Sequence, residues 1–126
     1  MKIFGKPLSA YVAFAKGLII AVLVVGIVRL AMSLGGMPNT TVRWFSITVV
    51  MWIGVIYYAI RVHTARFGSY RHLLPIAAIA NIVAQSIAIA GIAIAMVTGV
   101  TNIFSTPEYS FGTAPLAHIA AHIFIG

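Results

Sequence analysis

Long apolar runs separated by short polar breaks make up most of this chain. Three runs cover about residues 8–34, 42–62 and 73–97, and a fourth occupies residues 114–126. A bilayer core about 30 Å thick takes roughly 20 apolar residues in a helix that rises about 1.5 Å per residue. The pattern therefore predicts an all-α integral membrane protein, a single transmembrane helical domain with three full spans and a fourth, complete or partial one.

Two breaks between the runs carry residues that stop and start helices. The glycine pair and the proline of residues 35–39 cannot continue a helix, and either Thr40 or Thr41 is placed to cap the next one. Gly68 suits the end of the second span, and Ser69 suits the cap of the third. These residues predict the limits of the first three spans.

The last connector and the last run differ from this scheme. Residues 98–113 are polar, and Ser105 and Glu108 have the S-x-x-E spacing of a capping box, which predicts a short interfacial turn of helix. Residues 114–126 give about 20 Å of helix, which is short of a full span. We therefore expect the sequence to be a truncated version of a longer protein.

Composition favours lipid as the surrounding medium. Hydrophobic residues make up 62% of the chain and charged residues 7%, too few to coat a water-facing surface. The net charge of +7 comes from cations scattered over helix ends rather than from one basic face, so we expect no nucleic-acid partner. The chain has no cysteine, which excludes disulfides and thiolate metal sites.

The distribution of lysine and arginine predicts the orientation. Positive residues gather in the N-terminal arm and the second loop, with fewer around the first loop and none in the third. They are Lys2 and Lys6, then Arg61, Arg66 and Arg71, against Arg29 and Arg43. We expect a multi-pass protein of the bacterial inner (cytoplasmic) membrane with a cytoplasmic N-terminus, whose first run is a retained helix rather than a cleaved signal peptide.

Basic residues near a bilayer surface also attract lipid. We expect Arg61, Arg66 and Arg71 to contact anionic lipid headgroups, because each basic residue near the surface contributes about 1 kcal/mol. His63 and His72, in the same segment, are expected to be solvated or to lie among the headgroups. At the other end of the first span, a long side chain can extend from the helix to the interface, and we expect this of Arg29.

Small residues recur on one face of two spans. Ala13, Gly17 and Ala21 follow one another at intervals of four, which would let another helix approach closely. The third span has a similar seam, with isoleucines around most of the remaining circumference. The seam consists of Ala77, Asn81, Ala84, Ala88, Gly91 and Ala95. We expect the seam to face protein and the isoleucines to face lipid or neighbours.

Asn81 and Gln85 form an i, i+4 pair near the middle of the third span. Amide groups at that depth need hydrogen-bond partners, so we expect them to link helices. A contact to a quinone or another polar substrate is the alternative.

His118 and His122 are the sharpest candidates for binding a cofactor. Positions i and i+4 share a helix face, and imidazole is a good ligand for the iron of haem or the magnesium of chlorophyll. One of them could serve as a single axial ligand, and with Glu108 the pair could form a transition-metal site. The simpler alternative is that both histidines form hydrogen bonds near the outer interface.

The sequence predicts a protein that is not an enzyme. One acidic residue in the whole chain leaves no acid and base pair for catalysis. The leading hypothesis is an accessory subunit of a larger membrane-embedded complex, energy-converting and hence respiratory or photosynthetic, with other membrane protein subunits as partners. The alternatives are a tetrapyrrole-binding membrane subunit that uses His118 or His122, and a small oligomeric channel or carrier.

Overall fold

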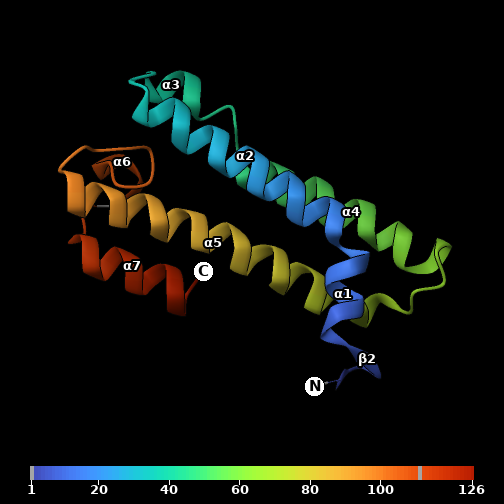
Figure 1. Cartoon of the computed structure of the whole chain (residues 1–126). Helices are drawn as coiled ribbons and strands as arrows, with labels where there is room; N and C mark the ends of the chain where they lie inside the picture. The colour runs from blue at the N-terminus through green and yellow to red at the C-terminus, as the bar shows by residue number, and fades with distance from the viewer. Residues whose placement is uncertain (1, 111) are drawn as a thin grey trace.

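The computed structural model describes residues 2–110 and 112–126, and it is mostly helical (Figure 1). Within these residues three helical segments are long and apolar enough to cross a membrane, namely Lys16–Leu34, Asn39–Thr64 and Tyr70–Thr98. A shorter apolar helix, Pro115–Phe124, follows them. The three predicted spans are confirmed as helices of sufficient length and hydropathy.

The first apolar run forms two helices rather than one. Helix α1 covers Leu8–Phe14 and helix α2 covers Lys16–Leu34, with a change of direction at Ala15. The aromatic side chains of α1 explain this change, because they pack on the loop after the second span instead of continuing along the axis of α2. Phe14 stacks on Phe67 with 4.0 Å between ring centroids, and Tyr11 meets the edge of the same ring at 5.5 Å.

A small antiparallel hairpin precedes α1, and the sequence did not predict it. Strand β1, Lys2–Ile3, pairs with strand β2, Lys6–Pro7. The two turn residues, Phe4 and Gly5, both have positive φ, at 49° and 84°. Two-residue hairpins of type I′ have this geometry, but their usual signal has asparagine or aspartate where this chain has a phenylalanine.

The second span begins later than predicted. A short helix α3 covers Asn39–Val42, and the long helix α4 covers Ile47–Thr64. The predicted caps Thr40 and Thr41 lie inside α3, and Ser46 caps α4 instead, because its hydroxyl accepts a hydrogen bond from the Val49 N–H at 3.3 Å.

The end of α4 also differs from the prediction. The chain turns into the left-handed conformation at Arg66, with φ of 51°, two residues before Gly68, which was expected to end the span. At Gly68 the requirement for glycine is steric, because a Cβ atom there would lie 2.5 Å from the His72 ring.

The third span matches its predicted limits closely. A single 3₁₀ turn η1, Tyr70–His72, leads into helix α5, Leu73–Thr98, which ends at Gly99 in the left-handed conformation. Ser69 precedes the turn as predicted, and its N–H donates to His72 Nδ1 at 3.0 Å. The connector then forms the expected turn of helix, α6, Pro107–Ser110, and the last run forms α7, Pro115–Phe124.

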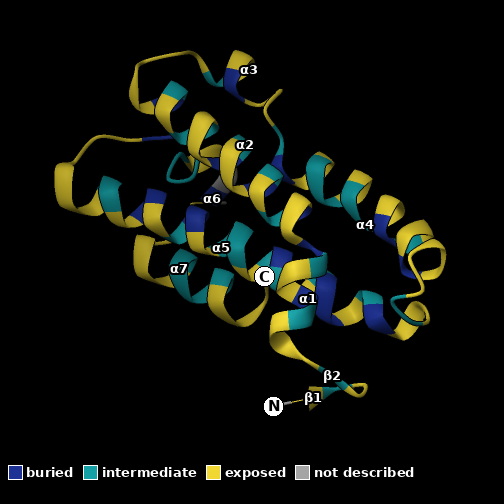
Figure 2. Cartoon of the chain, turned by 45° about the vertical axis from the view of Figure 1, so that its right-hand side comes forward, coloured by how far each residue is buried: buried dark blue, intermediate teal, exposed yellow. Residues whose placement is uncertain are grey.

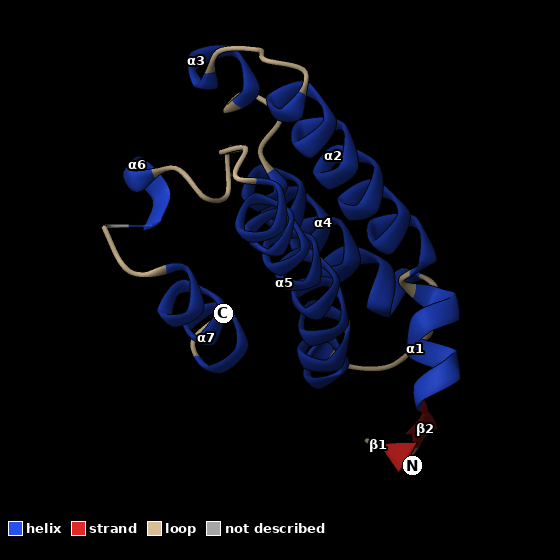
Figure 3. Cartoon of the chain, turned by 60° about the vertical axis from the view of Figure 1, so that its left-hand side comes forward, coloured by secondary structure: helices blue, strands red, loops and turns tan. Residues whose placement is uncertain are grey.

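Helix α5 is the centre of the bundle. It packs against α2, α4 and α7, and Figures 1 and 3 both show it between α2 and α7. The outward faces of the helices are exposed (Figure 2) and carry many large apolar side chains, while a cluster of buried residues forms the core. The core consists of Tyr11, Ala15, Leu18, Val22, Ile47, Tyr58, Val62, Ile76, Ala80 and Ile87.

Only some of the small residues on the two predicted helix faces are buried among the described residues. Ala13 and Gly17 are exposed and Ala21 is half-buried, so their close approach to another helix stays a prediction. On α5 the predicted seam residues Ala88 and Gly91 are buried, but so are Ile76, Ile87 and Ile92. Those isoleucines pack inside the chain because α5 has neighbours on several sides, whereas Ile82 is 66% exposed.

Candidate ligand-binding cavity

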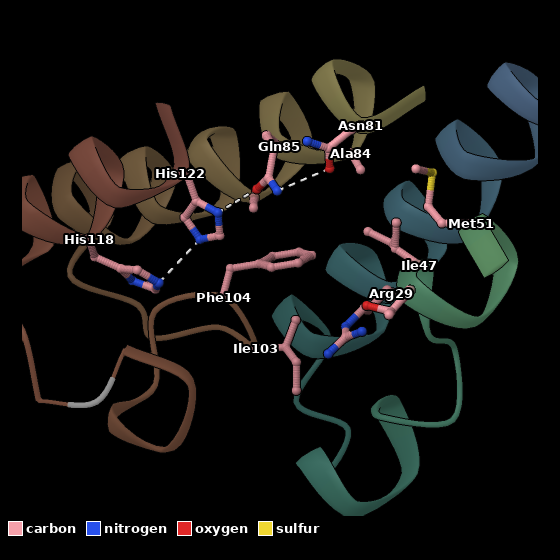
Figure 4. Close-up of a pocket in the computed structure, with 12 residues that line it drawn as sticks. Arg29, Ile47, Met51, Asn81, Ala84, Gln85, Ile103, Phe104, His118 and His122 are labelled. Atoms are coloured by element: carbon pink, nitrogen blue, oxygen red, sulfur yellow. Dashed lines mark hydrogen bonds between the residues drawn. The ribbon is translucent and has the colours of Figure 1, made fainter. Parts of the chain in front are cut away.

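A cavity of about 350 Å³ lies where α2, α4, α5 and α7 meet the connector after α5 (Figure 4). Its polar lining consists of Arg29, Thr48, Asn81, Gln85, His118 and His122, and its apolar lining of Ile47, Met51, Ala84, Ala88, Ile103 and Phe104. The volume lies in the range of roughly 300–1,000 Å³ that is typical of small-molecule sites.

Helix α5 contributes two amides to this lining. Asn81 and Gln85 are one turn apart, and Gln85 Nε2 donates to Asn81 Oδ1 at 3.3 Å. The Asn81 amide donates in turn to the backbone carbonyl of Gly126. The predicted pair therefore links α5 to the segment that follows α7.

Helix α7 directs His122 at these amides, and His118 at His122. His122 Nδ1 lies 2.5 Å from Gln85 Oε1, and the Nε2 atoms of His122 and His118 are 3.2 Å apart. An amide oxygen can only accept a hydrogen bond, so His122 Nδ1 carries the proton. In the neutral pair His122 Nε2 then accepts from His118 Nε2, which gives one directed chain of bonds along the cavity wall (Figure 4).

The two pairs that the sequence singled out separately thus form one network. Helical spacing identified each pair, but Gln85 and His122 are 37 positions apart. The periodicity of one helix carries no information on which face of another helix it meets. Both histidines form hydrogen bonds, as the simpler alternative expected, and the partner of His122, Gln85, lies halfway along α5.

Arg29 lines the same cavity from α2, although the sequence assigned it to the interface. Its guanidinium Nη1 donates to the Phe45 carbonyl at 3.4 Å, and its Cζ lies 5.4 Å from the centroid of the Phe104 ring. A residue that was expected to extend outward is therefore half-buried and places its charge at the cavity.

The connector after α5 holds Phe104 against the cavity through bonds that the sequence did not reveal. Buried Asn102 donates to the Gly91 carbonyl at 2.7 Å and accepts from the Phe104 N–H at 3.0 Å. The Ile103 N–H donates to the Ser33 hydroxyl at 2.8 Å. Gly91 packs against this loop, since a Cβ there would lie 2.7 Å from the Phe104 ring.

The metal site that combined Glu108 with the two histidines is wrong. Across residues 2–110 and 112–126, no three His, Asp or Glu side chains are close enough together to hold a metal ion. Glu108 is exposed on α6. The fixed positive charge of Arg29 in the same cavity also opposes a metal cation.

The basic residues that were predicted to meet lipid lie at the far end of the bundle. Arg61, Arg66 and Arg71 are exposed there, so their contact with headgroups stays a prediction. His72 is buried, contrary to expectation, and stacks near Tyr11 with 6.1 Å between ring centroids. His63 is exposed and meets the edge of the Tyr70 ring.

Aromatic contacts fasten the N-terminal arm to this end of the bundle. Lys6 Nζ lies 4.7 Å from the Phe67 ring centroid, and Arg71 Cζ lies 5.5 Å from the Phe4 ring centroid. The basic arm and the basic loop are therefore on the same side of the molecule.

Comparison with known proteins gives no match to a protein-family model, to a curated protein sequence or to a solved structure.

Proposed function

We propose that this chain is an integral membrane subunit that holds a small ligand in the cavity between α2, α4, α5 and α7, with no covalent chemistry of its own. The observation that supports this is the convergence of Arg29, Gln85 and His122 from three helices onto one cavity. Ionisable and amide side chains are costly inside a membrane, and where they occur they commonly mark a binding site.

The lining favours a ligand that accepts hydrogen bonds. A guanidinium has five N–H donors and no acceptor, and each amide nitrogen has two hydrogens. Among the described residues, the lining contains a fixed positive charge at Arg29 and no carboxylate. A ligand with carbonyl oxygens or a negative charge therefore complements the cavity.

A role within a larger complex is part of this proposal. The outer face of α4 is strongly apolar, with Trp52 67% exposed and Ile53 and Ile56 exposed beside it. Such a face suits lipid or a neighbouring membrane subunit. The proposed host is an energy-converting complex, respiratory or photosynthetic, because such complexes hold small redox ligands within the bilayer. If the chain leaves the membrane in mild detergent without other subunits, this part of the proposal is wrong.

The proposed location is the bacterial inner membrane with a cytoplasmic N-terminus. The supporting observation is that the hairpin with Lys2 and Lys6 is joined to the loop with Arg66 and Arg71 at one end of the bundle. Loops rich in lysine and arginine stay in the cytoplasm. Arg61, Arg66 and Arg71 would then contact the anionic lipids of the inner leaflet.

A tetrapyrrole is a second candidate for the ligand. Metal-bound histidines almost always donate their other ring N–H to an oxygen acceptor, and Gln85 Oε1 holds His122 in this way. Against it, a flat macrocycle bound to His122 Nε2 would occupy the place of His118, whose Nε2 is 3.2 Å away. The His118 ring would have to turn aside.

The test is to purify the full chain in mild detergent and identify what comes with it by absorption spectroscopy and mass spectrometry. We expect a small molecule with carbonyl or anionic groups that is lost from an Arg29→Gln variant and retained by a His63→Ala control. A Soret or chlorophyll band that disappears in a His118→Ala, His122→Ala double variant would support the tetrapyrrole instead. Preparations with no bound molecule would contradict the proposal.

A further inference from the structure

We propose that the ligand is a para-quinone, a flat ring with a carbonyl oxygen at each end. The inference rests on the proposed function and names the ligand class of the same cavity. Its basis is that Arg29 and the pair of Gln85 and His122 lie on opposite sides of Phe104 in the cavity.

One polar end is formed by Arg29 of α2. Its guanidinium is held by the Phe45 carbonyl and lies over the Phe104 ring. Guanidinium is always charged in proteins and offers a forked set of donors, so it can bind a carbonyl oxygen while keeping its other contacts.

The other polar end is formed by the network of α5 and α7. In Figure 4, Gln85 and His122 lie on the opposite side of Phe104 from Arg29. The Gln85 and Asn81 amides each use one hydrogen, toward Asn81 Oδ1 and the Gly126 carbonyl respectively. Each amide nitrogen has a second hydrogen that can be donated to a ligand oxygen.

The part of the cavity between the two polar ends suits an uncharged, flat ring. Phe104 presents its aromatic ring to the cavity, and Ile47 and Met51 face it from α4. The Phe104 backbone is fixed by Asn102, so the ring wall is formed before any ligand arrives.

Competing ligand classes fit this arrangement less well. A fatty acid has one polar end and would place methylene groups against either Arg29 or the amides. A metal cation would meet the charge of Arg29 without a carboxylate in the lining. A para-quinone can accept hydrogen bonds at both ends of the cavity, and it is soluble in the hydrocarbon of a bilayer.

The experiment uses the full chain in lipid nanodiscs and a photoreactive azido-benzoquinone with a decyl tail. Labelled residues are mapped by mass spectrometry, and the competitors are decylubiquinone and dodecanoate. We expect labels within residues 81–88 and 115–122, displaced by decylubiquinone and not by dodecanoate. Arg29→Gln and Gln85→Leu are each expected to weaken binding about tenfold, and His63→Ala to leave it unchanged.

The outcomes separate the inference from the proposed function. Displacement by dodecanoate with dependence on Arg29 alone would show an anionic amphiphile, so the quinone would be wrong and the proposed function would stand. Labelling spread over lipid-facing residues of the wild-type chain, with no other small molecule bound, would overturn both. Because the map is made on the wild type, this result does not depend on whether the variants fold.

Discussion

His122 illustrates what one side chain contributes to this molecule. It is an ordinary helix residue by position, yet it joins α7 to α5 through Gln85 and aligns His118 behind it. In hydrocarbon, a polar side chain that loses its partner stays unsatisfied unless another protein group replaces that partner. The energetic value of such bonds is nevertheless modest, because the unfolded chain in the membrane also finds partners.

The strength of this link can be measured by a double-mutant cycle. We expect His122→Leu and Gln85→Leu to be coupled by about 0.6 kcal/mol, and by no more than about 2 kcal/mol. Unfolding in mixed micelles, followed by circular dichroism, gives the four stabilities. His122→Leu combined with Ser86→Ala should be additive, because Ser86 bonds to its own helix at Ile82. A coupling near zero for the first pair would show that the His122 to Gln85 bond does not stabilise the fold.

Candidate site residues could be identified from the sequence more readily than the residues that they contact. The i, i+4 pairs of α5 and α7 were evident because helical spacing is local. Asn102 and Ser33 were missed, since the sequence around them is an ordinary connector and helix end, and the Ser33 contact joins residues 70 positions apart. Arg29 was placed wrongly because a long side chain can point outward or inward from the same helix position.

At the scale of elements, the close approach of two helices depends on a glycine that lies outside the predicted small-residue repeats. Gly54 of α4 lies directly under Leu18 of α2, so a Cβ atom there would collide with the Leu18 side chain. Gly17, which does belong to the predicted repeat, is near the Tyr58 hydroxyl, which would lie 3.5 Å from an added Cβ. The packing of α2 on α4 therefore relies on a different glycine from the one that the pattern indicated.

These two glycines form a matched pair for a test of packing. We expect Gly54→Ala to destabilise the protein by about 1–3 kcal/mol, because buried Leu18 must shift. Gly17→Ala should be neutral or stabilising by up to about 1 kcal/mol, because alanine favours the helix and meets an ordinary contact. Thermal unfolding in detergent would compare them. Equal effects of the two substitutions would contradict the α2 to α4 geometry.

The N-terminal hairpin is held by a side-chain hydrogen bond to α1 in addition to its cation–π contacts. The Tyr11 hydroxyl donates to the Ile3 carbonyl at 2.7 Å. We expect Tyr11→Phe to lose about 1 kcal/mol locally, so that amides of residues 2–8 exchange hydrogen faster while those of α5 do not change. Hydrogen exchange read by mass spectrometry measures this, and Tyr57→Phe on exposed α4 is the control. Unchanged exchange in the hairpin would show that the bond does not hold the arm.

At the scale of the whole molecule, hydrophobic length predicted the three long helices and their order. It could not predict the break at Ala15 or the late start of α4, because those depend on contacts of Tyr11 and Phe14 and on the Ser46 cap. The length of an apolar run can be read from the sequence alone, whereas a bend in a helix depends on which surfaces of the folded chain pack together.

The proposed orientation can be tested with single cysteines, because the chain has none of its own. Ala65→Cys should react with an impermeant maleimide only from the cytoplasmic side, and Met37→Cys only from the opposite side. Ile82→Cys, which faces outward from the middle of α5, should not react from either side. Reaction of the first two from the same side would contradict the spans, and the reverse pattern would contradict the orientation.

The long sequence separation of the cavity walls sets the order in which the molecule can be assembled. If α5 enters a bilayer during synthesis, Asn81 and Gln85 precede their partners by 45 and 37 residues. Until α7 has been made, these amides can form the bond from Gln85 to Asn81 but not those to His122 and Gly126. A delay in translation after residue 98 would therefore prolong the stage at which one wall of the cavity is missing.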